Sequence, residues 1–298
     1  MTQPLVSIIV ATYKRDFALN KALISLSQQN YSNLEIILVS DNAEDEWNNK
    51  VNAIANNLKD NHPDIQMQLI INEQNMGSAE TRNIGIRAAN GDYITFLDDD
   101  DLYLPEKVNN QVRFMIQNQL DYCITDLYLY DEKERLIDKR IRNYILKHDC
   151  DSLLKYHLKY HMTGTDTMMF RKEYLLKIGG FPPIDVGDEF YLMKEAITGG
   201  GKFGYLPECS IKAYVHSETD GLSSGDSKIK GENELFAYKK TMFKEIDNAS
   251  RRYIIMRHHA VLAFAYVRKK QYMQFVFEAI KSFVYAPLSC LSLLASRR

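Results

Sequence analysis

The chain has 298 residues, of which 45% are hydrophobic and 26% are charged, and its formal net charge is −2. This length and composition are typical of a globular protein with a substantial core, and the near-neutral charge excludes a global basic field that attracts nucleic acid. The four cysteines are scattered without a C-x-x-C pair, which argues against a zinc knuckle or a disulfide scaffold and favours reduced thiols in a cytosol.

The N-terminal third alternates between predicted strands and helices. The segment 5–11 (LVSIIVA) is an unbroken β-rich run, typical of a strand covered on both faces. Asp16 is expected to cap the helix that follows it. The pattern predicts further strands at 34–40, 66–71 and 92–97 and helices near 44–58 and 78–89. We therefore expect a parallel α/β sheet with right-handed crossovers.

The pattern changes along the rest of the chain. Pro105 favours the first turn of another helix, and beyond it the sequence predicts short strands and helices. From Gly231 onward the chain is predicted to be helical. Its buried positions are expected to include Tyr253, Met256, Val261 and Phe264.

No segment reaches the roughly 20 apolar residues that a membrane-spanning helix requires, and the N-terminus is interpreted as a strand rather than a signal peptide. The nearest approach, SFVYAPLSCLSLLASRR, is interrupted by Pro287, follows YVRKKQY and ends in Arg297 and Arg298. Apolar residues flanked by cations suit an in-plane membrane anchor. A last helix packed on the protein or on a partner subunit fits the same pattern, so both interpretations stay open.

Polar clusters follow three of the predicted strands: TYKR, SDNAED and the four aspartates Asp98–Asp101. Ligands bind at the carboxyl ends of the strands in such sheets, so we expect one site. Close carboxylates repel by roughly 3 kcal/mol per pair at an effective dielectric of about 20, and in an extended segment Asp98 and Asp100 share one side. Clustered carboxylates are the hard ligands that Mg²⁺ or Mn²⁺ prefers, so the pattern predicts a cation. A solvated acidic turn, or a set of helix caps before Pro105, is the alternative.

Three blocks of the sequence carry a family resemblance. They are VSIIVATYKR with ILVSDNAED, then NMGSAETRNIGIRAANGDYITFLDDDD, and GGFPPIDVGDEFYLMKEA, and together they span about residues 5–200. With them the chain resembles family 2 glycosyltransferases of the GT-A fold, which transfer a sugar from a nucleotide diphosphate with inversion. The resemblance implies a Rossmann-like, mostly parallel sheet flanked by helices, with a C-terminal helical extension.

The resemblance assigns roles around a nucleotide sugar. Asp100 matches the metal-binding aspartate of the D-x-D motif, Asp99 falls where the family contacts the ribose, and Asp98 is the motif's first position. The implied metal is Mn²⁺ or Mg²⁺. Further positions that match residues around the nucleotide are Thr12, Tyr13, Arg15, Asp41, Gly77 and Arg82.

Three of these positions have simpler interpretations. Asp41 matches the residue that accepts a hydrogen bond from uracil, which favours UDP, but it would also serve as a cap for the next helix. Tyr13 would equally be a packing aromatic residue and Arg82 a surface charge. Gly77 allows close approach of the backbone to a ligand.

Sugar transfer with inversion requires a carboxylate that takes the proton from the attacking hydroxyl. Asp188 in VGDEF matches the family's base, with Glu189 beside it as the fallback, although a carboxylate before the helix EFYLMKEAI would also act as a cap. His216 falls where several relatives place a residue near the metal or the diphosphate. Thr163 and Thr165 in TGTDTMMF are candidates for the acceptor pocket.

We expect a GT-A domain, 1–220, and a helical extension, 221–298, which the motifs of the family do not cover and which is a candidate for association with a membrane or a partner. Residues 1–120 are the expected nucleotide-sugar-binding half and 121–220 the acceptor-binding half. The chain lacks a Q-x-x-R-W motif, and its single tryptophan is Trp47. We therefore expect a non-processive enzyme that adds one sugar to a glycan or lipid-linked acceptor in bacterial surface-polysaccharide synthesis, in the cytoplasm or at the inner face of its membrane.

Proteins of other classes share parts of this pattern. A D-x-D phosphatase needs a Gly-Thr or Gly-Val continuation, whereas Leu102 and Tyr103 follow here. A nucleotidyltransferase usually has a glycine-rich phosphate loop, which ATYKRDFALN is not. An inactive sugar-nucleotide-binding subunit would have lost the metal aspartate or the base. Homo-oligomer formation stays open.

Overall fold

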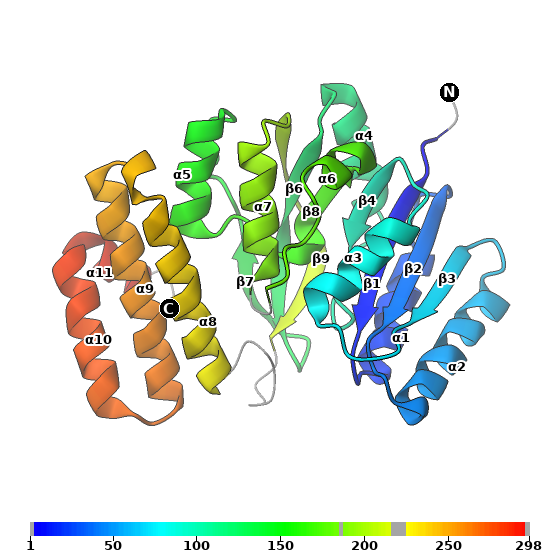
Figure 1. Ribbon diagram of the computed structural model, residues 1–298, viewed down its shortest axis with the longest axis horizontal. Coiled ribbons are helices and arrows are strands. Elements are labelled where there is room, and N and C mark those ends of the chain that lie inside the picture. Colours follow the sequence, from blue (N-terminus) through cyan, green and yellow to red (C-terminus); the bar gives the residue numbers. More distant parts are fainter. Residues whose placement is uncertain (1–2, 185–186, 216–224, 296–298) are drawn as a thin grey trace. The chain divides into compact units, whose positions relative to one another are not determined.

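The computed structural model describes residues 3–184, 187–215 and 225–295 (Figure 1). The predicted residue His216 lies outside the described residues. The described chain forms two compact units, one within Met1–Cys150 and Met162–His216 and the other within Asp151–His161 and Ser217–Arg298. The functional division expected at residue 220 remains a prediction.

The described part of the first unit contains one nine-stranded sheet (Figure 1). In spatial order its strands are β3 (Gln66–Ile71), β2 (Leu34–Ser40), β1 (Val6–Thr12), β4 (Tyr93–Phe96), β8 (Met168–Arg171), β6 (Tyr122–Asp131), β9 (Phe203–Val215) and β5 (Leu102–Tyr103), and β7 (Leu136–Arg140) pairs with β6. Strands β3, β2, β1 and β4 are parallel, as the alternating pattern predicted. The later strands are mixed: β8 is antiparallel to both of its neighbours, and β6 is parallel to β9.

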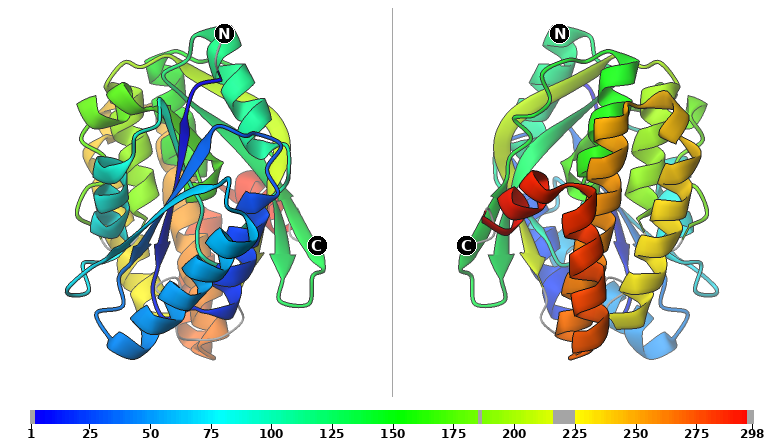
Figure 2. Two further views of the ribbon diagram at one scale, coloured as in Figure 1. Left: turned by 90° about the vertical axis from the view of Figure 1, so that its right-hand side faces the viewer. Right: turned by 90° about the vertical axis from the view of Figure 1, so that its left-hand side faces the viewer.

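Helices cover both faces of this sheet. They are α1 (Phe17–Ser27), α2 (Asp45–Asn61), α3 (Ser78–Ala88), α4 (Lys107–Asn118), α6 (Lys172–Lys177) and α7 (Asp188–Thr198). Figures 1 and 2 show α1 and α3 on opposite faces of β1. Accordingly, Ile8 of β1 belongs to the core cluster that includes α1, whereas Ile9 lies against Gly85 of α3 so closely that a Cβ there would come within 2.5 Å of its side chain. The sheet is therefore buried on both faces. Ligands of such sheets bind outside the carboxyl ends of the strands.

Most of the predicted elements of the N-terminal third are found. Strands β2 and β3 have the expected bounds, and the Asp16 carboxylate accepts a hydrogen bond from the Phe17 amide at the start of α1. Helix α4 begins two residues after Pro105, so this proline precedes the helix instead of occupying its first turn. The predicted α/β sheet flanked by helices is present in the first unit.

The second unit consists of helices in its described part. They are α5 (Cys150–Tyr160), α8 (Gly225–Thr241), α9 (Asn248–Arg268), α10 (Tyr272–Tyr285) and α11 (Pro287–Ala295). Of the expected core residues of α9, Met256 is buried, and Tyr253, Val261 and Phe264 are half-buried. Within the described ranges no single helix is long and apolar enough to cross a membrane. The pair α10 and α11 passes that test jointly but bends by 119° at its junction.

Candidate active site

The loop after β1 holds one aspartate of the acidic segment. The Thr12 hydroxyl donates to Asp99 Oδ2 over 2.7 Å, and the Tyr13 amide donates to the same oxygen over 3.3 Å. Arg15 Nη1 lies 3.2 Å from Asp99 Oδ1 and also forms an ion pair with Asp100. Burial raises the pKa of Asp99 to about 7, against the opposing effect of Arg15. The Tyr13 ring is half exposed, which leaves it accessible to a ligand.

The loop after β2 contributes Asp41, whose side chain is buried. Its Oδ1 accepts a hydrogen bond from the Met76 amide over 2.7 Å, and its Oδ2 accepts one from the Gly77 amide over 3.0 Å. The residue that caps α2 is Glu44, so the interpretation of Asp41 as the cap of the next helix is wrong. Asp41 instead fixes the chain that leads into α3. Gly77 adopts a φ of +80° there, a conformation that strains any residue with a Cβ.

The four aspartates form a turn between β4 and β5. The Asp101 amide donates to the Asp98 carbonyl over 3.1 Å, so the expectation that Asp98 and Asp100 share one side of an extended segment is wrong. Asp101 points toward β9, where its Oδ1 accepts from the Tyr214 amide over 2.8 Å. Helix α4 has Glu106 as its cap, and Asp101 is buried. Neither a set of helix caps nor a fully solvated turn describes this segment.

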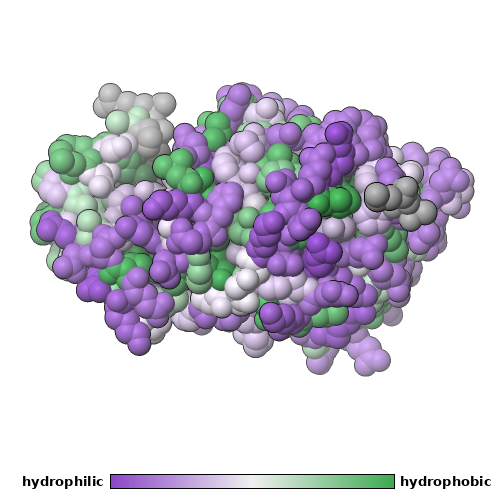
Figure 3. All heavy atoms as spheres, turned by 90° about the horizontal axis from the view of Figure 1, so that it is seen from above, coloured by the Kyte–Doolittle hydropathy of each residue, from purple (hydrophilic) through white to green (hydrophobic). Residues whose placement is uncertain are grey.

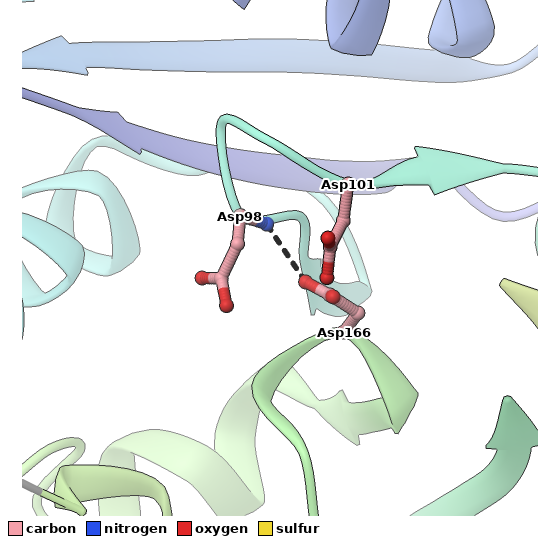
Figure 4. Close-up of side chains that lie close together, drawn as sticks. All are labelled: Asp98, Asp101 and Asp166. Carbon is pink, nitrogen blue, oxygen red and sulfur yellow. Dashed lines mark hydrogen bonds between the residues drawn. The ribbon is translucent and has the colours of Figure 1, made fainter. Parts of the chain in front are cut away.

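Asp98, Asp101 and Asp166 lie together as an acidic cluster (Figure 4). Each offers one carboxylate oxygen, and these oxygens lie within 4.8 Å of one another. The Asp98 amide also donates to Asp166 Oδ1 over 2.7 Å. Burial, with the charge of Asp98 as the next cause, raises the pKa of Asp166 to about 7, and burial beside Asp166 raises the pKa of Asp101 strongly. The carboxyl groups of the cluster therefore bind protons more readily than exposed aspartates do.

Asp166 was not among the residues predicted for the site, although it lies in the segment TGTDTMMF that holds Thr163 and Thr165. Strand β8 runs antiparallel to β4, with Thr95 opposite Met169. Extending this register by three residues places Asp98 opposite Asp166. The available signal was an acidic residue just before a buried strand. The antiparallel pairing that makes it informative joins segments about 70 residues apart.

A buried ammonium group lies behind the turn. Lys107 Nζ donates to Thr95 Oγ1 over 2.5 Å and to the Tyr103 hydroxyl over 2.7 Å. The Tyr103 hydroxyl in turn donates to the carbonyl of Phe96, the last residue of β4. Burial lowers the pKa of Lys107 to about 7, while Asp166 acts in the opposite direction. This network, which was not predicted from the sequence, connects β4 before the turn to β5 after it.

Arg82 connects the turn to a distant part of the chain. It extends from α3 with Nη2 2.7 Å from Asp98 Oδ1 and Nη1 2.7 Å from Asp188 Oδ2. Its side chain is 12% exposed, so the interpretation as a surface helix charge is wrong. Burial opposes its charge, but the two carboxylates outweigh burial and raise its pKa.

Asp188 is the first residue of α7 and is buried. Its Oδ2 also lies 3.3 Å from the Ser78 hydroxyl, and its Oδ1 accepts a hydrogen bond from the Glu189 amide over 2.9 Å. Burial raises the pKa of Asp188 to about 6, which Arg82 counteracts. Asp188 is thus a carboxylate that ionises close to neutral pH. The Arg82 guanidinium links it to Asp98 of the aspartate turn.

Removing the Arg82 charge is expected to destabilise the fold. Arg82→Met leaves Asp98 and Asp188 without their shared partner, which costs about 3 kcal/mol of unfolding free energy near pH 8. The loss should be smaller at pH 5, because carboxylates with raised pKa values in the folded state bind protons there and lose their charge. Urea unfolding at both pH values measures this. Arg87→Met on the same helix is the control, since Arg87 is exposed and pairs with Glu80 at the surface. Equal losses for the two variants would contradict the bridging role.

The remaining predicted residues lie in the same unit or outside the description. Thr163 and Thr165 are buried at the start of the segment that carries Asp166. Their expected role at the acceptor is untested, and His216 lies outside the described residues. The site therefore contains residues from the ends of β1, β2 and β4, from α3, from the start of β8 and from α7.

The sheet order and the grouped strand ends define a GT-A type α/β protein. The family model for glycosyl transferase family 2 matches residues 7–179, which is more than half of the chain. The chain therefore belongs to this family.

Individual relatives match shorter segments. An uncharacterized glycosyltransferase of Haemophilus influenzae is 40% identical over 132 residues, which are 43% of this chain and 50% of that protein. The UDP-Glc:alpha-D-GlcNAc-diphosphoundecaprenol beta-1,3-glucosyltransferase WfaP of Escherichia coli is 34% identical over 134 residues, which are 45% and 49% of the two chains. The match thus spans about half the length of these relatives.

A solved structure shares the fold over almost the whole chain. The crystal structure of S. aureus TarS 1-349 in complex with UDP-GlcNAc has a TM-score of 0.60 at 16% identity, and the match covers 94% of this chain and 91% of that chain. The chain is therefore a member of glycosyl transferase family 2 with the GT-A type of fold.

Proposed function

We propose that this glycosyltransferase moves one sugar from a nucleoside diphosphate sugar, a UDP-sugar in the first instance, to a hydroxyl group of a glycan or lipid-linked acceptor with inversion at the anomeric carbon. The observation that carries the proposal is the Arg82 bridge, which brings Asp188 to the aspartate turn from 90 residues further along the chain. This bridge supports the proposal that a base and the diphosphate-binding groups share one site.

In the proposed reaction Asp188 is the general base. The acceptor oxygen forms a bond to the anomeric carbon, the bond from that carbon to the diphosphate oxygen breaks, and the hydroxyl proton passes to the Asp188 carboxylate. Burial makes Asp188 more basic than an exposed aspartate, and Arg82 keeps it ionised near neutral pH. A carboxylate whose pKa lies near the working pH combines both requirements.

The acidic residues fit a divalent cation. Asp98, Asp99, Asp101 and Asp166 have raised pKa values because they are buried close to one another, and the cations that contact the turn's carboxylates are Arg15 and Arg82 in the part that is described. Carboxylate oxygens are preferred ligands of Mg²⁺ and Mn²⁺. We assign Asp100 as a ligand, with the acidic cluster around it. A bound cation would supply positive charge against the diphosphate leaving group.

The choice of substrates rests on the relatives. WfaP is named for UDP-Glc and a diphosphoundecaprenol-linked acceptor, and TarS was solved with UDP-GlcNAc. These names support a UDP-sugar as donor and a lipid-linked acceptor. We further propose that Asp41, Thr12 and Tyr13 lie near the nucleotide, and that the enzyme acts in surface-polysaccharide synthesis at the inner face of the cytoplasmic membrane, as the family resemblance implies.

The transfer itself is tested with purified chain, Mn²⁺, a panel of nucleoside diphosphate sugars and short diphospholipid-linked acceptors. We expect release of the nucleoside diphosphate to require the acceptor, and proton NMR of the product to show the opposite anomeric configuration to the donor. Retained configuration would refute the role of Asp188 as a base. Absence of transfer with every donor would favour an inactive binding subunit.

A further inference from the structure

Helix α10 turns its polar side toward the protein. Its two buried residues are Glu278 and Ser282. Glu278 Oε2 lies 2.6 Å from His259 Nδ1, and the Ser282 hydroxyl donates to the Met256 carbonyl over 2.9 Å. Both partners belong to α9, so polar contacts hold α10 on its neighbour. A helix of a soluble protein normally buries its apolar side instead.

The apolar residues of α10 and of the adjoining helix α11 are largely exposed. We call this surface the apolar face. It comprises Tyr272, Met273, Val276, Phe277, Ile280, Phe283, Val284 and Tyr285 of α10 with Leu288, Leu291 and Leu294 of α11, which are between 38% and 84% exposed. Figure 3 shows hydrophobic residues gathered around the C-terminal helices. Exposed apolar surfaces of this extent mark interaction sites.

Cationic residues lie before α10 and beside the apolar face. Arg268 and Lys270 precede α10 and are exposed, and Lys281 Nζ lies 3.9 Å from the ring centroid of Phe277 within the face. The sequence from 268 to 295 contains one carboxylate, Glu278, which is buried and engaged by His259 and Lys281. Among residues 268–295, the exposed charged side chains are therefore cationic.

We propose that the apolar face docks in the plane of an anionic lipid bilayer. A second copy of this chain would present the same cations and no carboxylate to pair with them, whereas an anionic lipid surface offers opposite charge to these cations and an acyl phase to the face. The 119° bend between α10 and α11 suits two helices lying along a surface. Tyr272 at the start of α10 is 64% exposed, and exposed tyrosine rings sit favourably at the headgroup level.

Vesicle flotation tests this with the full chain, in the absence of nucleotide sugar and acceptor. We expect the chain to float with vesicles of equal parts phosphatidylcholine and phosphatidylglycerol, and to bind phosphatidylcholine vesicles at least about tenfold more weakly because the cations lose their partners. The double variant Met273→Asp/Phe277→Asp should lose binding to the anionic vesicles by about tenfold or more, since two charges would enter the acyl boundary. Both residues are more than half exposed, so the fold should survive, and circular dichroism verifies this.

The control is Leu146→Asp/Leu176→Asp, which places the same charges at exposed leucines of the first unit and should bind vesicles like the wild type. Equal binding by the wild type and the Met273→Asp/Phe277→Asp variant would overturn the proposal. A wild-type dimer that this variant dissociates, without any vesicle binding, would assign the face to a second copy instead. Because the assay contains no substrate, its result is independent of whether the proposed sugar transfer is correct.

Discussion

Asp188→Asn is expected to lower kcat by about 10² to 10⁴, the range typical of a positioned general base. An amide cannot take the proton of the acceptor hydroxyl, whereas donor binding uses other residues and should change little. The variant should stay folded, because Arg82 retains Asp98 as a partner. Steady-state kinetics with separate donor and acceptor titrations, and circular dichroism for the fold, measure both effects.

Two further variants make this test specific. Glu195→Gln removes a carboxylate from the same helix at a half-exposed position and should leave kcat unchanged. Glu189→Gln should have a modest effect if Asp188 is the base. A wild-type rate in Asp188→Asn together with a collapse in Glu189→Gln would move the base to Glu189.

The pH dependence of kcat should follow the ionisation of Asp188. Its pKa of about 6 predicts that kcat falls as the pH drops through 6, because the base must be ionised to accept the proton. The residual rate of Asp188→Asn should lose this dependence. If wild type and variant kept the same acidic limb, another group would be responsible for it.

Asp100→Asn is expected to abolish metal-dependent donor binding and with it transfer. Loss of a ligand should weaken the metal by about a hundredfold or more, beyond the 10- to 100-fold that is typical of an outer-shell partner. The melting temperature should stay the same or rise, because the change removes one of several mutually repelling carboxylates. A structural role for Asp100 would lower it.

The control for this variant is Asp138→Asn, which alters an exposed aspartate of β7. It should match the wild type in metal binding and in melting temperature. Retained manganese dependence in Asp100→Asn, with its loss in Asp98→Asn, would move the metal site toward the cluster of Asp98, Asp101 and Asp166.

The parallel half of the fold could be predicted because its signal is local. Strands such as β2 and β3 are apolar runs between helices with caps or helical spacing, and short crossovers leave few arrangements. The order of the later strands depends on pairings between segments far apart in sequence, such as β8 inserted between β4 and β6. Local pattern carries no information about such pairings.

The candidate site shows the same limit. The pattern and the resemblance predicted Thr12, Asp41 and Asp99, which follow parallel strands, as candidate site residues; their roles stay predictions. Asp166 and Lys107 were missed because their importance comes from antiparallel register and from burial. The polarity of α10 was missed too, since an amphipathic pattern does not say which side of a helix faces the protein.

The central claim is that the turn of four aspartates, Asp98–Asp101, binds a nucleoside diphosphate sugar through a divalent cation. Isothermal titration calorimetry of the wild-type chain with UDP-sugars, with and without Mn²⁺, tests it most directly. We predict saturable binding of at least one UDP-sugar that requires Mn²⁺ and disappears with chelator. Binding that is equally tight without the metal, or no binding of any nucleoside diphosphate sugar in its presence, would contradict it.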